Sequence, residues 1–147
     1  MFHDIQNQLS TKQAFTTGTA VSTDTYDLNA IGHDPSIGRT LSGLFAVTTA
    51  AGGGVIATSY TLQVIQSAAA NLGTPDVIAT RTVLGSECTI DKQFGVPIPQ
   101  GSISKRYLGL QVVTTGGTAP TVSMSNYIVP QSEIPFNKFF TKVYETI

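Results

Sequence analysis

Apolar and polar residues alternate along several short stretches of the chain, as they do in β-strands. The clearest example is the stretch YTLQVIQ, where Tyr60, Leu62 and Val64 fall on one face and Thr61 and Gln63 on the other. Successive side chains of a strand point to opposite faces of its sheet, so this stretch is predicted to be a strand with one buried face.

The same reasoning predicts further strands, with turn residues between them. The full set of predicted strands is 19–28, 43–49, 60–66, 77–84, 88–91, 94–98, 105–114 and 121–129. Within 77–84, Ile78 and Leu84 fall on the face opposite to Arg81. Pro97 and Pro99 confine the segment at 94–98 to a sheet edge or a loop, because proline cannot donate to a central ladder.

Residues 105–114 give the strongest strand pattern, with Leu108, Leu110 and Val112 on one face. Gly116 and Gly117 separate this segment from 121–129, so the two are predicted to form a hairpin. Strand candidates recur at intervals of roughly 8–15 residues, which is typical of a sandwich. The predicted fold is therefore all-β, a jelly roll or antiparallel β-sandwich, in a single domain over residues 1–147 with its core at about 15–129.

Both ends of the chain differ from this body. Residues 1–14 are polar and lack a strand pattern, which indicates an N-terminal arm or an edge segment. Residues 130–147 are expected to form a C-terminal arm, and within it residues 136–147 show the i, i+3, i+4, i+7 spacing of a short amphipathic helix. Such a helix either packs on its own sandwich or inserts as an arm into a neighbouring subunit or a groove of a partner protein, and a terminal strand is the remaining alternative. The candidate partner-binding residues are Phe136, Phe139, Phe140, Val143, Tyr144 and Ile147.

The composition limits the possible partners. Only 12% of the residues are charged and the net charge is −1, so no basic field exists to attract nucleic acid or an anionic membrane. Neither an apolar run of transmembrane length nor a leader pattern is found, so synthesis in the cytoplasm is expected. A weakly charged surface favours association with other protein subunits.

We find no residue pattern typical of a catalytic or metal site, so no enzymatic activity, cofactor or metal is predicted. His33 and Asp34 are adjacent, but in a glycine- and proline-containing loop, and His3 is near the N-terminus. A lone Cys88 has no zinc-ligand spacing, and Asp24, Asp27 and Asp34 do not match a twelve-residue calcium loop, although a loop calcium site is not excluded.

Three further motifs have ordinary explanations. Glu87 and Asp91 bracket a short predicted strand, and strand parity alone puts any two carboxylates on one face half the time. The run at 52–54 (GGG) lacks the Lys-Ser/Thr that completes a phosphate-binding loop, so a flexible connection is predicted there. Lys105 and Arg106 are too few for nucleic-acid binding and are expected to be a solvated strand end or to form salt bridges.

Several segments, taken in order, resemble the capsid cement (decoration) proteins of short-tailed and related tailed bacteriophages. They are STKQAFT at 10–16, YDL at 26–28 with the following IGR at 37–39, the strand at 60–66, and PQG at 99–101 leading into KRYLGL at 105–110. The resemblance spans roughly residues 9–129. Residues 131–147 depart from it, because the similar proteins end soon after the last strand.

The resemblance implies a jelly-roll protein on the outer surface of an icosahedral head. It also implies trimers at threefold or quasi-threefold positions that clamp subunits of the major capsid protein, without catalytic activity or a cofactor. Two alternatives remain: a carbohydrate- or receptor-binding jelly roll of a virion, although the chain has no Trp, and a neck or tail structural adaptor. A hydrolase would need an acid/base pair, for which the sequence offers no good candidate.

Overall fold

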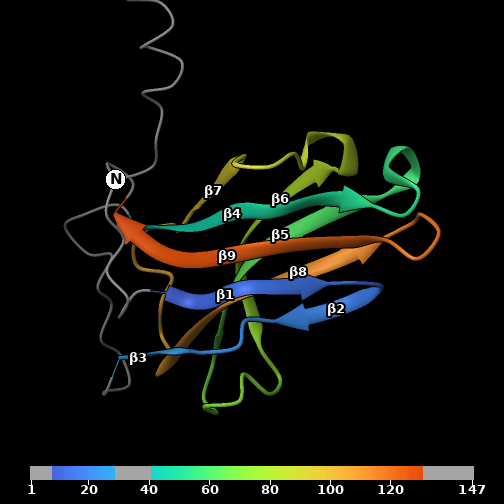
Figure 1. Cartoon of the computed structure of the whole chain (residues 1–147). Coiled ribbons are helices and arrows are strands. Elements are labelled where there is room, and N and C mark those ends of the chain that lie inside the picture. Colours follow the sequence, from blue (N-terminus) through green and yellow to red (C-terminus); the bar gives the residue numbers. More distant parts are fainter. Residues whose placement is uncertain (1–7, 29–40, 131–147) are drawn as a thin grey trace, which may run out of the picture.

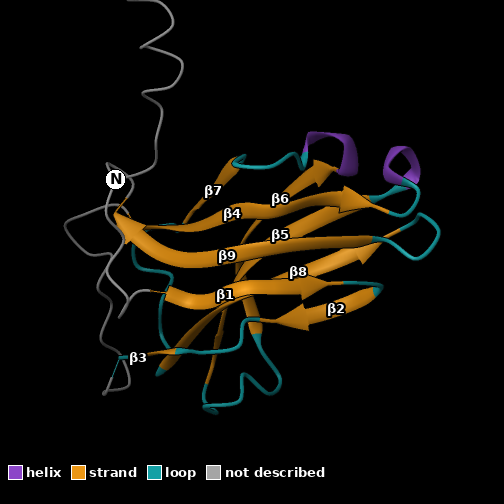
Figure 2. Ribbon diagram, in the orientation of Figure 1, coloured by secondary structure: helices purple, strands orange, loops and turns teal. Residues whose placement is uncertain are grey.

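The computed structural model describes residues 8–28 and 41–130, and almost all of their regular structure is β-strand (Figure 2). The strands are β1 (Gln8–Phe15), β2 (Gly18–Val21), β3 (Tyr26–Asp27), β4 (Leu41–Gly52), β5 (Ser59–Ser67), β6 (Asp76–Leu84), β7 (Gln93–Pro97), β8 (Tyr107–Thr115) and β9 (Thr121–Pro130). Two single turns of 3-10 helix, η2 (Val55–Ala57) and η3 (Gly85–Glu87), interrupt them.

The strands form two antiparallel sheets that pack face to face, which confirms the predicted β-sandwich (Figure 1). One sheet, called sheet A here, has the order β1-β9-β4-β7; the other, sheet B, has the order β2-β8-β5-β6, with β3 also paired to β8. No helix in the described ranges has the length and apolar character that a bilayer crossing needs.

The core lies between the sheets and is built by the predicted alternation. On β5, Tyr60, Leu62 and Val64 are all 0% exposed, and on β8 the inward residues Leu108 and Leu110 are equally buried. Sheet A supplies the facing layer from β4, β7 and β9, including Phe45, Phe94 and Met124. Each fully buried side chain of this size contributes roughly 1.5–3 kcal/mol by leaving water.

The predicted hairpin between β8 and β9 is wrong. The two strands follow one another in sequence, but β8 pairs with β2, β3 and β5 in sheet B whereas β9 pairs with β1 and β4 in sheet A. The connecting loop contains three residues with positive φ, Gly116, Gly117 and Ala119, and carries the chain from one sheet to the other. Both strands still turn their apolar faces to the core, so periodicity alone does not distinguish this crossing from a hairpin.

The structure shows which face of β6 is turned to the core. Arg81 is paired with the core residue Leu62, so its side chain starts on the inner face. From there it reaches sheet A, where Nη1 donates to the Gly95 carbonyl at 3.1 Å and the guanidinium lies 5.4 Å from the centre of the Phe94 ring. Leu84, on the outer face, is 55% exposed. A long basic side chain can cover apolar surface at a sandwich edge while its charge stays solvated.

Several strand boundaries differ from the predictions. The segment predicted at 19–28 is split into β2 and β3, because Ser22 leaves the strand and its hydroxyl donates to the Asp24 carbonyl at 2.8 Å. Residues 88–91 form a turn after η3 rather than a strand. Residues 8–14 belong to β1, an edge strand of sheet A, so the edge alternative holds for them. Residues 1–7 and the predicted C-terminal helix lie outside the described residues.

The glycine run at 52–54 is a close-packed turn rather than a loose connection. Gly52 ends β4, while Gly53 and Gly54 have positive φ values of 68° and 73°. A Cβ added at Gly53 would collide with the carbonyl of Ala119, and one at Gly54 would lie 2.8 Å from the amide nitrogen of Thr118. Backbone packs directly on backbone here, which only glycine permits.

Candidate interaction surface

Across β2, β8, β5 and β6, the outer face of sheet B presents a surface without charged side chains, which we call the uncharged face. Strand register places its residues in transverse rows across β2, β8, β5 and β6. The uncharged face consists of Thr19, Val21, Ser59, Thr61, Gln63, Thr80, Thr82, Leu84, Gln111, Val113 and Thr115. All of them except Gln111 are partly or fully exposed.

Cross-strand contacts hold the polar groups of this face in place. Gln111 Nε2 donates to Gln63 Oε1 at 2.6 Å, and the hydroxyls of Thr61 and Thr82 are 3.4 Å apart. Side chains directly opposite on neighbouring strands stabilise a sheet by roughly 0.2–1 kcal/mol per pair. The face is therefore pre-ordered, and part of its hydrogen-bonding capacity is already satisfied within the protein.

The charged side chains of the described ranges lie elsewhere, at strand ends, in turns or on the other sheet. They are Lys12, Asp24, Asp27, Asp76, Arg81, Glu87, Asp91, Lys92, Lys105 and Arg106, with as many acidic as basic groups. The one charged residue in the middle of a sheet B strand, Arg81, is turned to the inner face. A partner that docks on the uncharged face would have no ionised group of this face to desolvate.

At one end the uncharged face is bounded by a loop, residues 68–75, that folds back over the sheet. Leu72 of this loop is 3% exposed and packs on Gly109 of β8, where a side chain would collide with it. Ile65, on the same outer face, is 0% exposed. The Ser67 hydroxyl donates to the Gly73 carbonyl at 2.6 Å and ties the two ends of the loop together.

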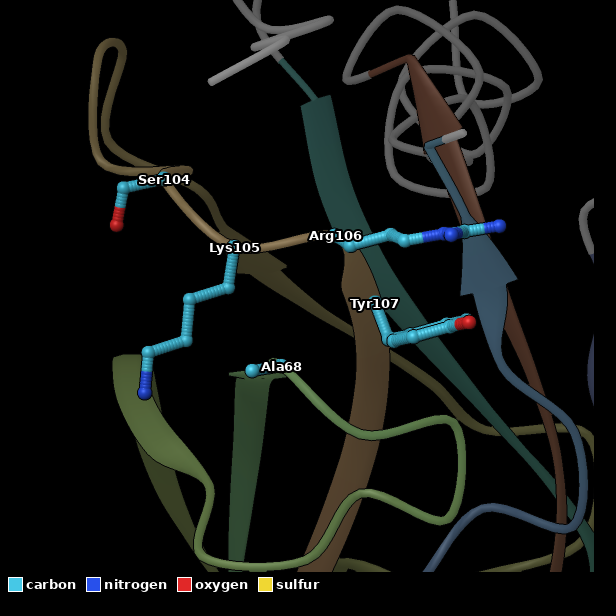
Figure 3. A pocket seen from close by; sticks show the side chains of 5 residues that line it. All are labelled: Ala68, Ser104, Lys105, Arg106 and Tyr107. Atoms are coloured by element: carbon cyan, nitrogen blue, oxygen red, sulfur yellow. The ribbon is translucent and has the colours of Figure 1, made fainter. Parts of the chain in front are cut away.

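A pocket of about 250 Å³ lies where the chain enters β8, lined by Ala68, Ser104, Lys105, Arg106 and Tyr107. Figure 3 shows the side chains of Lys105 and Arg106 leaving the chain in different directions, so the two cations do not converge on one point.

Both cations of the pocket already have acidic partners. Lys105 Nζ lies 2.7 Å from Asp76 Oδ2, and Arg106 contacts both carboxylate oxygens of Asp27, at 2.8 and 3.0 Å. The hydrogen bond with Asp27 raises the pKa of Arg106, so its charge is permanent. The predicted salt-bridge role of this basic pair is confirmed.

Gln66 fixes the chain just before this pair. Its buried side-chain oxygen accepts from the amide nitrogens of Ser104, at 2.8 Å, and Lys105, at 3.2 Å. The side chain therefore takes the place of a strand neighbour for the amides of Ser104 and Lys105.

The described ranges contain no arrangement of groups suited to metal binding: no three His, Cys, Asp or Glu side chains are grouped there. Burial raises the pKa of the Cys88 thiol to about 11, which leaves it protonated and unreactive at neutral pH. Glu87 caps η3 by accepting from the Leu84 amide at 2.8 Å. Asp24 lies in an exposed turn, and His3, His33 and Asp34 fall outside the described residues.

The predicted partner-binding residues Phe136, Phe139, Phe140, Val143, Tyr144 and Ile147 also lie outside the described residues. The uncharged face was missed at the level of sequence, although a signal for it exists. Thr61 and Gln63 in the predicted strand at 60–66, and Gln111 in the one at 105–114, are uncharged residues at polar positions. Recognising one continuous face required the strand order, which the sequence does not reveal.

Comparison with known proteins gives one family match. The Bbp16 family model matches residues 9–128. No curated protein is similar in sequence to this chain.

Two solved structures are similar in part. A crystal structure of PirA shares 15% identity, with 86% of this chain and 97% of PirA aligned at a TM-score of 0.46. The infectious bursal disease virus VP2 subviral particle shares 16% identity over 87% of this chain but only 32% of VP2, at a TM-score of 0.37. With TM-scores below 0.5, neither likeness indicates what this chain does.

Proposed function

This chain belongs to the Bbp16 family, and we propose that it is a capsid cement (decoration) protein of a tailed bacteriophage. In this proposal it docks on the outside of the head and stabilises contacts between subunits of the major capsid protein. The part of the sequence that resembles cement proteins, about residues 9–129, coincides with the part that the family model matches, 9–128. The proposed role is structural, without catalysis or a cofactor.

The observation that carries the proposal is the uncharged face. A flat array of Thr, Val and Gln side chains can meet another protein surface at a low desolvation cost, because no charge has to leave water. Strand spacing of about 4.8 Å and a rise of about 3.3 Å per residue give this array an area of roughly 300 Å². That is well below the roughly 800 Å² per partner of a standard stable interface.

A contact of this size is weak by itself, so stable attachment requires several copies that bind together. We therefore propose that the protein acts as a homo-oligomer, specifically the trimer that the cement-protein resemblance implies. Linking several weak contacts makes each later one effectively intramolecular and raises the overall affinity by orders of magnitude. Closed cyclic symmetry also presents the same face of each copy to equivalent lattice positions.

The test is attachment of purified protein to heads that lack it, measured by co-sedimentation. Placing a carboxylate in the middle of the uncharged face, with Thr61→Glu or Thr82→Glu, is expected to weaken attachment at least tenfold. Thr11→Glu, an exposed threonine on β1 of the other sheet, is the matched control and should attach normally. Normal attachment of both variants in the uncharged face would refute this docking mode.

The pocket at the start of β8 favours a second candidate, a carbohydrate- or receptor-binding module. Tyr107, Ser104 and the two cations line the same pocket. An aromatic ring can stack on a sugar while polar side chains orient it, so this set of side chains could bind a carbohydrate. Glycan-array binding that Tyr107→Ala abolishes would support this candidate. A neck or tail adaptor would instead be recognised by its position in images of intact particles.

A further inference from the structure

A group of unpartnered polar atoms is buried at the contact of β1 with β9. Asn126 is 0% exposed, yet neither its Oδ1 nor its Nδ2 has a hydrogen-bond partner in the described part of the protein. The hydroxyl of Ser10, 2% exposed, likewise lacks one. Buried polar groups are nearly always hydrogen-bonded, because leaving one without a partner costs much of its hydration free energy.

Strand register brings the two residues together. β1 and β9 lie side by side in sheet A (Figure 1), and Ser10 is the register partner of Asn126. From Gln8 to Ser10, β1 advances two residues while β9 advances one, from Tyr127 to Asn126, so a bulge lies at this point. Residues opposite each other in an antiparallel pair have Cβ atoms about 4.5–5.5 Å apart. Ser10 lies between two register shifts and is the residue opposite Asn126, and the two side chains do not hydrogen-bond each other.

Other buried polar atoms without partners, on Ser42, Thr48, Gln93 and Thr114, do not group in this way. None of these residues is paired with another of them in the strand register of the described sheets. Among the described residues, Ser10 and Asn126 are thus the two register partners that both carry buried polar atoms without hydrogen-bond partners.

The chemistry of the site decides what fits it. The Asn126 amide offers both donors and an acceptor, and the Ser10 hydroxyl offers one donor and acceptor lone pairs. An ion is a poor match, because no carboxylate or basic group of the described core faces the two residues: Phe45 of β4 is the neighbour of Asn126 on its other side, and Leu9 precedes Ser10. A small neutral molecule that both donates and accepts is required.

We propose that Ser10 and Asn126 bind one internal water molecule that bridges β1 to β9. Internal waters make about three hydrogen bonds to buried polar groups, which is the number of unpartnered atoms here. The water supplies, through side chains, a link between the strands at a place where the bulge shifts their register. This proposal goes beyond the proposed function and does not depend on it.

The decisive measurement is magnetic relaxation dispersion of water nuclei, which counts water molecules that stay in a protein for longer than its tumbling time. Wild-type protein is expected to hold one more such molecule than the double variant Ser10→Ala/Asn126→Leu, which removes all three polar atoms. Ser125→Ala is the matched control: it is the neighbouring residue on β9, and its hydroxyl already accepts from the Lys12 amide at 3.0 Å. That variant should keep the wild-type count.

A crystal structure of the wild type gives an independent readout if the double variant does not fold. It is expected to show a density peak within about 2.7–3.2 Å of Ser10 Oγ and of an Asn126 amide atom. Equal water counts in the wild type and a folded double variant would overturn the proposal. So would a direct Ser10–Asn126 hydrogen bond with no third peak beside it.

Discussion

Gly109 shows how a single missing side chain positions a loop. A Cβ at this position of β8 would overlap Leu72 Cδ1 and lie 2.9 Å from Cδ2, so the loop at 68–75 rests on the bare backbone of the strand. Gly109 does not have a positive φ, and alanine would suit the strand conformation itself. The requirement for glycine therefore comes from packing and not from backbone strain.

The first prediction is that Gly109→Ala destabilises the protein by about 1–3 kcal/mol, the usual cost of overpacking. In a Leu72→Ala background the three atoms nearest to the added methyl are removed, and the same change should be neutral or slightly stabilising. Denaturant unfolding of the four proteins measures this coupling as a double-mutant cycle. Equal costs in both backgrounds would mean that Leu72 is not the obstacle.

Cys88 is the residue for which burial changes the chemistry most clearly. Its thiol is 1% exposed, and burial, followed by the nearby Glu87 charge, raises its pKa from 9.0 to about 11. Burial also raises the pKa of the adjacent core residue Tyr60, with Cys88 as a second cause. Both groups therefore stay neutral in the folded protein over a pH range in which the unfolded chain ionises.

The second prediction follows from the sign of this shift. Between pH 9 and 11 the folded protein holds the Cys88 proton more strongly than the unfolded chain does, so the free energy of unfolding falls as the pH rises. Up to about 2–3 kcal/mol is lost across this window. In Cys88→Ala the decline between pH 9 and 11 should be shallower, measured by urea unfolding at each pH. Parallel pH profiles for both proteins would contradict the assignment.

Among the strands, periodicity determined which residues are buried but not which strands pair. Tyr60, Leu62 and Val64 were placed in the core from alternation alone, and the structure agrees. The prediction of a β8–β9 hairpin was wrong, because the pattern of burial is the same in both arrangements. Two strands bury alternate residues whether they pair in one sheet or face each other from opposite sheets of a sandwich. The uncharged face of sheet B depends on that pairing, so it could not be derived from the sequence.

Strand β6 shows a second limit of prediction from sequence periodicity. It is an edge strand among those described, with Val77 48% and Leu84 55% exposed, and such edges tend to pair with other chains. Its inward-turned Arg81 makes this pairing unfavourable, because a strand docked on the edge would partly desolvate the charge. The sequence places Arg81 opposite to Leu84 but does not show which of the two faces is buried, since the partner of Arg81 on sheet A is known only from the fold.

The third prediction concerns this edge. Arg81→Val removes the inward charge and its contacts with Gly95 and Phe94, so self-association through β6 is expected to increase. Sedimentation velocity over a range of protein concentrations measures it. Thr82→Val is the matched control, because it adds the same side chain at the next position, on the outer face. Equal association of both variants would show that apolarity, not the lost charge, is responsible.

In the molecule as a whole, the ion pairs lie apart from the uncharged face. The ion pairs Lys105–Asp76 and Arg106–Asp27 lie at the end where β8 begins, whereas the uncharged face carries no charged side chain. The described ranges contain as many acidic as basic residues, so long-range electrostatic steering is weak. Under the proposed function, attachment then depends on short-range packing and on the number of copies that bind together.

The fourth prediction is that attachment to heads is nearly independent of salt. Exposed charges are screened over about 10 Å at 0.1 M ionic strength and about 3 Å at 1 M, so a contact through ion pairs weakens steeply as salt is added. Docking through the uncharged face should change less than about twofold in apparent Kd between these conditions, measured by co-sedimentation. Sulfate, which strengthens apolar burial, should tighten it slightly. A tenfold or greater loss of affinity in sodium chloride would instead place the contact at the charged end, and Lys105→Ala and Arg106→Ala would then reduce attachment more than Thr61→Glu.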